Sequence, residues 1–160
     1  MEAATAWLPL LFGAVGVGVA FALYRVVVAY PAGDAKVTDI AEQIFIGAMT
    51  FMRREFTILA VVGVILFFLL GFGLGWSSAF AFVVGAVASG LAGFFGMRSA
   101  TKANVRTATA AHTKGAAQAL TVSFFGGSVM GLLVASLGLL GLGFLFLIFG
   151  ANPETAAIIQ

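Results

Sequence analysis

The chain contains no cysteine and very few charged residues, and both shortages exclude classes of protein. The absence of cysteine excludes disulfides and thiolate metal sites. Charged residues make up 9% of the 160 residues, against about 25% in soluble domains, while 62% of the residues are apolar. This composition excludes a soluble globular domain. It predicts an all-α membrane protein, with room for about four helical spans of roughly 20 residues each.

Motifs that carry chemistry are also missing. The sequence has no GxxxxGK[ST], HExxH or GxSxG pattern, and no cluster of aspartates to hold magnesium and phosphate. The single histidine, His112, has no acid near it in sequence and is interpreted as a solvated side chain. We therefore predict no catalytic, cofactor-binding or metal-binding residue in this chain. The polar candidates inside the apolar runs are serines, each expected to bond to its own helix backbone: Ser89, Ser123, Ser128 and Ser136.

Four apolar runs are long enough to cross a bilayer, and they predict spans at residues 6–24, 57–76, 79–97 and 120–148. The polar segment 25–56 lies between the first and second spans, and the polar segment 98–119 lies between the third and fourth. The first polar segment is typical of an amphipathic helix that continues into the second span, with Thr38 or Asp39 as its N-cap. An uncharged GLGWSS turn joins the second and third spans, which predicts that they are antiparallel neighbours.

A cleaved signal peptide is the alternative interpretation of the first apolar run. The residues before the run are MEAAT, which include an acid and no basic residue. Because a signal peptide carries positive charge in that position, we favour a retained span.

Small residues recur along the third and fourth spans. Gly85, Ser89 and Gly93 repeat at every fourth position, and a second ridge of Ala88, Ala92, Gly96 and Ala100 runs beside them. Such ridges predict close helix packing in lipid. The fourth span carries the same signal at Gly126, Gly127, Gly131, Gly138, Gly141 and Gly143.

The basic residues indicate the topology, because all of them lie in the two polar segments. Under the positive-inside rule, these segments are cytoplasmic and both ends of the chain are outside. Three of the basic residues, Arg98, Lys102 and Arg106, follow one another at intervals of four. They therefore form a stripe on one side of a helix that continues from the third span. We expect this stripe to mark topology and to attract anionic lipid headgroups. We favour these roles over the attraction of an anionic substrate. The eight basic residues are Arg25, Lys36, Arg53, Arg54, Arg98, Lys102, Arg106 and Lys114.

The stretch GAVASGLAGFFGMRSATKANVRTATAA resembles the third span and following segment of the membrane-bound, ion-pumping inorganic pyrophosphatases. The family pattern there is GMxxATxANVRTxxAA. FMRREFTILAVVG and ALTVSFFGGSVMGL resemble two further family blocks, so the likeness extends over residues 40–142. The matching positions of the pattern are Gly96, Met97, Ala100, Thr101, Ala103, Asn104, Val105, Arg106, Thr107, Ala110 and Ala111.

Four positions depart from the family pattern. Ile46 stands where the family usually has Glu, Glu55 and Phe56 replace Gln-Tyr, and Phe125 stands where Arg is common. These departures weaken expectations about local ion pairs and leave the resemblance in place.

The resemblance implies a longer parent protein of about sixteen spans that hydrolyses pyrophosphate at its cytoplasmic face and moves protons or sodium outward. It further implies Mg2+, with K+ as an optional second ion, a homodimer and no nucleic-acid partner. The family's substrate and metal ligands would follow residue 160, so the chain is expected to be a truncated N-terminal scaffold, inactive by itself.

A complete four-helix membrane module without enzymatic activity is the alternative. The reading frame after Gln160 distinguishes the two interpretations, since a stop codon directly after it favours the module.

Overall fold

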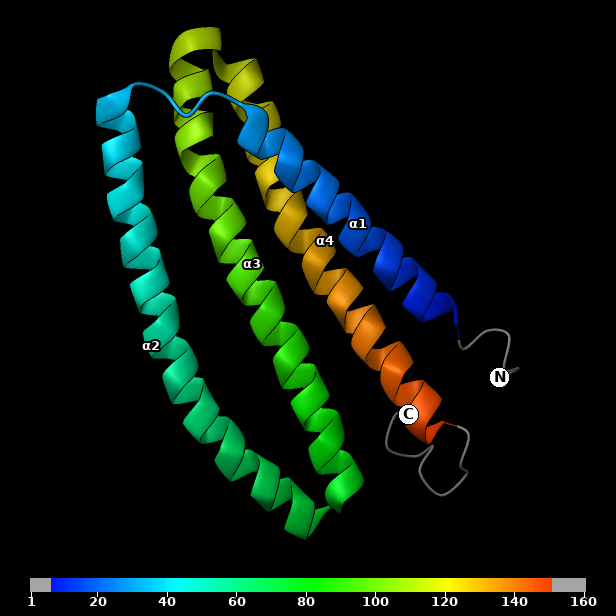
Figure 1. Ribbon diagram of the computed structural model, residues 1–160. Coiled ribbons are helices and arrows are strands. Elements are labelled where there is room, and N and C mark those ends of the chain that lie inside the picture. The colour runs from blue at the N-terminus through cyan, green and yellow to red at the C-terminus, as the bar shows by residue number, and fades with distance from the viewer. Residues whose placement is uncertain (1–6, 151–160) are drawn as a thin grey trace.

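The computed structural model describes residues 7–150, which form four long helices joined by short links (Figure 1). All four helices are long and apolar enough to cross a membrane. The described part of the chain contains no strand, and this confirms the predicted all-α membrane class. The helices are α1 (Leu8–Ala29), α2 (Ala35–Gly73), α3 (Trp76–Lys114) and α4 (Ala116–Phe149).

Three of the helices are longer than a bilayer is thick. Helices α2 and α3 have 39 residues each and α4 has 34. At 1.5 Å per residue, a helix of that length spans about 50–60 Å, against a hydrocarbon core of about 30 Å. The polar segments predicted as 25–56 and 98–119 are therefore largely extensions of apolar helices. The predicted continuation of an amphipathic helix into the second span is confirmed.

The two tightest links both depend on glycine. Leu74 and Gly75 alone separate α2 from α3, and Gly115 alone separates α3 from α4. Both glycines have positive φ, 100° and 88°, in a region that L side chains rarely adopt. The turn is thus shorter than predicted, and Trp76 begins α3 instead of ending the second span. Its ring folds back onto α2, where a Cβ added at Gly71 would lie 2.8 Å from it.

The N-cap predicted for the second helix is wrong. Asp34 is the N-cap, and its carboxylate accepts a hydrogen bond from the Val37 backbone N–H at 2.9 Å. The Thr38 hydroxyl instead donates to the carbonyls of Asp34 and Ala35, each at 3.0 Å. Thr38 and Asp39 therefore lie inside the helix, because the acidic cap at Asp34 already satisfies the first turn.

Helix α4 lies between α1 and α3, with which it makes extensive contacts, and α2 packs along α3. Figure 1 shows the α1–α2 link and the α3–α4 turn at one end of the bundle and the α2–α3 turn at the other. The predicted antiparallel arrangement of the second and third spans is confirmed. The molecule thus has a packed side, α1–α4–α3, and a peripheral helix, α2.

Glycines allow the close approach on the packed side. A Cβ added at Gly13 of α1 would lie 2.7 Å from the Leu140 side chain of α4 and 2.9 Å from the Ser136 carbonyl. A Cβ at Gly96 of α3 would lie 2.7 Å from Met130. Since real Cβ atoms do not approach so closely, a side chain at either position would push the helices apart. Gly96 belongs to one of the ridges predicted from the sequence, so the predicted close packing is confirmed at that position.

Candidate functional site

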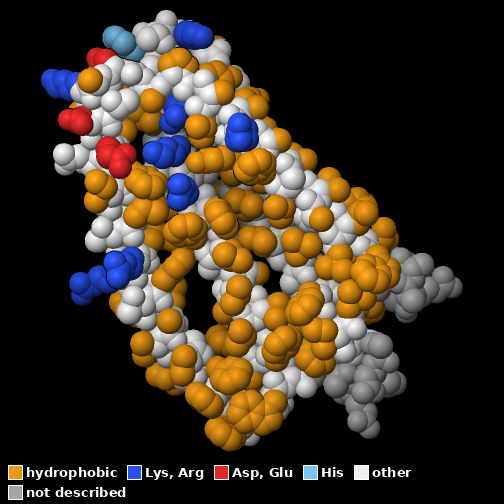
Figure 2. Space-filling view, in the orientation of Figure 1, with side chains coloured by type: hydrophobic (Ala, Val, Ile, Leu, Met, Phe, Trp, Pro, Cys, Tyr) orange, Lys and Arg blue, Asp and Glu red, His pale blue; other side chains and the backbone are white. Residues whose placement is uncertain are grey.

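The positively charged side chains gather towards one end of the molecule (Figure 2). This end carries the α1–α2 link and the α3–α4 turn, whereas Figure 2 shows no charged side chain of the described residues near the opposite end. Acidic side chains lie at the same end, but no ion pair forms among residues 7–150. The stripe that the sequence places on α3 lies within this basic end.

Arg106 of this stripe holds the end of α1. Its Nε donates to the Val28 carbonyl at 3.3 Å, and one terminal nitrogen donates to the Lys102 carbonyl at 2.9 Å. Val28 is in the last turn of α1, where carbonyls have no partner within the helix. A guanidinium there satisfies a carbonyl and complements the negative end of the helix dipole. Arg106 is therefore a cap supplied to α1 by α3.

Thr109, one turn further along α3, holds the link between α1 and α2. Its hydroxyl donates to the Ala32 carbonyl at 3.0 Å. Gly33 lies so close that an added Cβ would be 2.8 Å from the Thr109 hydroxyl oxygen. We call Arg106 and Thr109, together with the Val28 and Ala32 carbonyls that accept hydrogen bonds from them, the link clamp. Sequence reasoning missed it, because no pattern indicates which backbone carbonyl a distant arginine reaches.

The other two cations of the stripe lie next to α2. Lys102 Nζ is 4.6 Å from the centre of the Phe45 ring, and the Arg98 guanidinium carbon is 5.9 Å from the same centre. Both distances are within the range of cation–π attraction. The residues of the stripe thus have different contacts. Arg106 belongs to the link clamp, whereas Lys102 and Arg98 contact Phe45 of α2.

The serines do not form the predicted bonds to their own helices. Ser89, Ser123, Ser128 and Ser136 donate no hydrogen bond within residues 7–150. Other hydroxyls make such bonds, most of them on threonines: Thr38, Thr50, Thr57, Ser78, Thr101, Thr113 and Thr121. A β-branched side chain is restricted at χ1, which suits a hydroxyl aimed at the preceding turn.

Two serines of the described part, Ser136 and Ser99, are buried. Ser136 is buried against Gly16 of α1 and fills the space that the glycine leaves. Ser99, on α3, is 1% exposed, and its hydroxyl has no hydrogen-bond partner among residues 7–150.

The titratable groups of the described part are not arranged as a metal site. Its acids all lie between residues 34 and 55, from the N-cap of α2 to the middle of that helix. His112 is exposed in the last turn of α3. No group of three or more His, Asp or Glu that could hold a metal ion occurs within residues 7–150.

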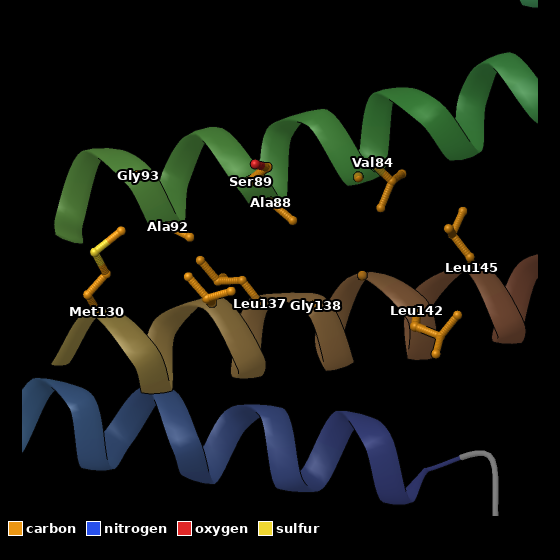
Figure 3. Close-up of a pocket in the computed structure, with 13 residues that line it drawn as sticks. Val84, Ala88, Ser89, Ala92, Gly93, Met130, Leu137, Gly138, Leu142 and Leu145 are labelled. Atoms are coloured by element: carbon orange, nitrogen blue, oxygen red, sulfur yellow. The ribbon is translucent and has the colours of Figure 1, made fainter. Parts of the chain in front are cut away.

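An apolar groove of about 410 Å³ separates α3 from α4 over part of their length. In Figure 3, Val84, Ala88 and Ala92 of α3 face Leu137 and Leu145 of α4 across it. Gly85, Gly93 and Gly138 also line the groove, and a Cβ added at any of them would meet nothing within 4 Å. The ridge of Gly85, Ser89 and Gly93 is therefore not in close contact with α4, which packs on the neighbouring ridge through Gly96.

A bundle of four apolar helices with its cations gathered towards one end defines a multi-pass membrane protein. The sequence model of the family described as Inorganic H+ pyrophosphatase matches residues 14–160. The chain belongs to this family. The resemblance based on the GMxxATxANVRTxxAA pattern is thereby confirmed.

Curated relatives share extensive identity with the chain. It is 42% identical over 137 residues to the K(+)-stimulated pyrophosphate-energized sodium pump of Thermotoga maritima, covering 85% of this chain and 19% of that protein. It is 43% identical over 121 residues to the K(+)-insensitive pyrophosphate-energized proton pump of Methanosarcina mazei, covering 74% and 18%. The chain thus spans about a fifth of the length of the relatives it matches.

Proposed function

We propose that the chain is the N-terminal membrane-spanning part of a pyrophosphate-energised ion pump, in which it serves as scaffold and membrane anchor. Membership of the family supports this function, and the share of the relatives that the chain spans supports a larger protein. The observation that carries the proposal is the row of unfilled glycines on α3 and α4. It identifies a surface that this chain does not cover itself.

The glycines of α4 differ in what they contact. A Cβ at Gly143 would lie 3.0 Å from Leu10 of α1, whereas one at Gly127, Gly131 or Gly138 would meet nothing within 4 Å. All three open glycines are exposed, as are Gly85 and Ser89 of α3. In lipid, a small residue contributes to packing only where another helix approaches it. Further spans of the parent protein are the proposed occupants of this face.

The active site of the parent protein is proposed to lie outside this chain. Magnesium prefers carboxylate oxygens, and the described residues offer no cluster of them, so they do not fit a magnesium–pyrophosphate site. The ligands for pyrophosphate and magnesium, any potassium site and the contacts of a homodimer are assigned to the remaining four-fifths of the protein. The coupling ion, proton or sodium, is assigned there too.

The charge distribution supports a proposed orientation. The basic end is proposed to face the cytoplasm, because positively charged segments are retained on that side. A reporter inserted at Gly115 is then cytoplasmic, and one fused after Gly150 is outside. The opposite pattern of reporter activity would overturn this orientation.

A chimera tests the scaffold function directly. The corresponding segment of the Thermotoga maritima relative is replaced by this chain, and pyrophosphate hydrolysis and ion uptake are measured in vesicles. We expect the chimera to hydrolyse pyrophosphate in the presence of magnesium, and the isolated chain in lipid to show no hydrolysis above background. Hydrolysis by the isolated chain, or a chimera that inserts and assembles yet is inactive, would contradict the proposal.

Two substitutions at one position serve as matched controls in the chimera. Gly131→Leu adds a bulky side chain to the open face of α4 and is expected to reduce assembly, measured as the yield of folded chimera. Gly131→Ala keeps the position small and is expected to assemble as the parent does. Equal yields from both variants would show that no helix approaches this face.

A further inference from the structure

A second groove, of about 340 Å³, lies between α1 and α3 with α4 as its floor. Its walls are apolar except at the basic end, where Tyr24 of α1 and Arg98 of α3 face it. Neither the Tyr24 hydroxyl nor the Arg98 guanidinium makes a hydrogen bond or ion pair within residues 7–150. The apolar lining consists of Val17, Ala20, Phe21, Phe95, Val129 and Leu133.

The position of these two polar groups in the groove indicates the chemistry of its occupant. Besides its contact with the Phe45 ring, the Arg98 guanidinium has no acid paired to it, and an apolar channel that ends at such a cation suits a molecule with a hydrocarbon tail and a negatively charged head. A guanidinium binds a phosphate through two parallel hydrogen bonds, and a phenol can donate a third. Basic pockets between membrane helices on the cytoplasmic side are known to bind anionic lipid headgroups.

We propose that this groove is a binding site for an anionic phospholipid. One acyl chain lies along Phe21, Phe95 and Leu133, and the phosphate binds Arg98 and Tyr24. The charge of the surroundings favours this occupant over a zwitterionic lipid, because Lys102 lies one helical turn beyond Arg98 and Arg106 another turn beyond that, with no acid paired to any of them. The proposal rests on membrane insertion alone and does not depend on the proposed function.

Native mass spectrometry of the chain in detergent micelles tests the site. The probes are phosphatidylglycerol and phosphatidylcholine with identical acyl chains, supplied in equal amounts. We expect phosphatidylglycerol to be retained roughly five-fold over phosphatidylcholine, the ratio expected for one cation close to an anionic lipid. Equal retention of the two lipids would overturn the proposal.

Three variants locate the effect in the groove. Arg98→Gln is expected to lower phosphatidylglycerol retention to the level of phosphatidylcholine. Arg54→Gln removes the same charge from an exposed position on α2, outside the groove, and is expected to retain the preference. Leu133→Trp fills the apolar part and is expected to reduce retention of both lipids, with Val17→Phe as a second blocking variant if Leu133→Trp does not fold. Equal losses in the Arg98 and Arg54 variants would show attraction to net charge alone and overturn the site.

Two further outcomes identify other occupants. Displacement of the retained phosphatidylglycerol by millimolar pyrophosphate would mean that the polar end binds soluble phosphates, and this contradicts a lipid site. A helix of the parent protein is the other candidate. Crosslinking from a cysteine introduced at Leu133 of the chimera, which reaches that helix only if it lies over the groove, would also overturn the proposal.

Discussion

The two sides of the molecule use the same small residues for different purposes. On the α1–α4–α3 side, Gly13, Gly96 and Gly126 each have a neighbouring side chain in the space that a Cβ would need. On the free side of α4, Gly127 and Gly131 have only open space around them. The glycine content of a membrane helix therefore does not reveal which of its faces is packed. Neighbouring residues on one helix can have opposite roles.

The largest expected effect compares two adjacent glycines. Gly126→Leu drives a side chain into Ala103 of α3 and is expected to destabilise the chain by about 3 kcal/mol. Gly127→Leu adds the same side chain one residue further along, where nothing is met, and is expected to change stability by less than about 1 kcal/mol. Unfolding in mixed detergent micelles, followed by circular dichroism, measures both. Equal effects would remove the distinction between the packed and the free side.

Removing the link clamp is expected to have the second-largest effect on stability, because the clamp joins α3 to the end of α1 and to the α1–α2 link. Arg106→Gln removes the charged donor to the Val28 carbonyl, and we expect a loss of about 2 kcal/mol, the usual value for a hydrogen bond to a charged group. Hydrogen exchange at residues 30–34 should increase at the same time. Lys102→Gln, one turn away, is the control and should leave exchange in this link unchanged. A change of the same size in both variants would exclude the clamp.

A smaller effect is expected at the beginning of α2, outside the packed side. Asp34→Ala removes the side chain that accepts from the Val37 N–H, and loss of such a cap costs about 1 kcal/mol. The increase in exchange should be confined to the first turn of α2. Asp39→Ala, inside the same helix, should have little effect, and the reverse result would restore the cap predicted from the sequence.

The smallest effect is expected where α2 meets the basic stripe. Phe45→Leu keeps an apolar side chain and removes the ring under Lys102, and we expect a loss of about 0.5 kcal/mol. Adding Lys102→Gln to Phe45→Leu should then cost less than Lys102→Gln does alone. A double-mutant cycle with no coupling between the two positions would show that the contact is without energetic consequence.

Much of the architecture was predictable from the residues. The four apolar runs, the uncharged turn and the glycine ridges are local patterns, so they indicate helices, their order and their tendency to pack. The error at the cap of α2 has a local reason too, since Asp34, Thr38 and Asp39 are all residue types that favour caps and only the backbone conformation selects one of them. The hydrogen bonds predicted for the serines were wrong because a serine side chain on a helix can also pack against a neighbouring helix. Ser136, which packs against Gly16 of α1, is an example.

By itself, the sequence determined that this protein is helical, lies in a membrane, carries its basic residues in two segments and belongs to a family of pyrophosphate-driven pumps. These properties depend on composition, on periodicity and on a dense local pattern, all of which can be read along one chain. Only the tertiary structure decided which glycines are covered, that Arg106 caps α1, and that Arg98 and Tyr24 share a groove. The physical reason is that each of these depends on the rotation and crossing point of two helices, which side-chain packing sets across long separations in sequence.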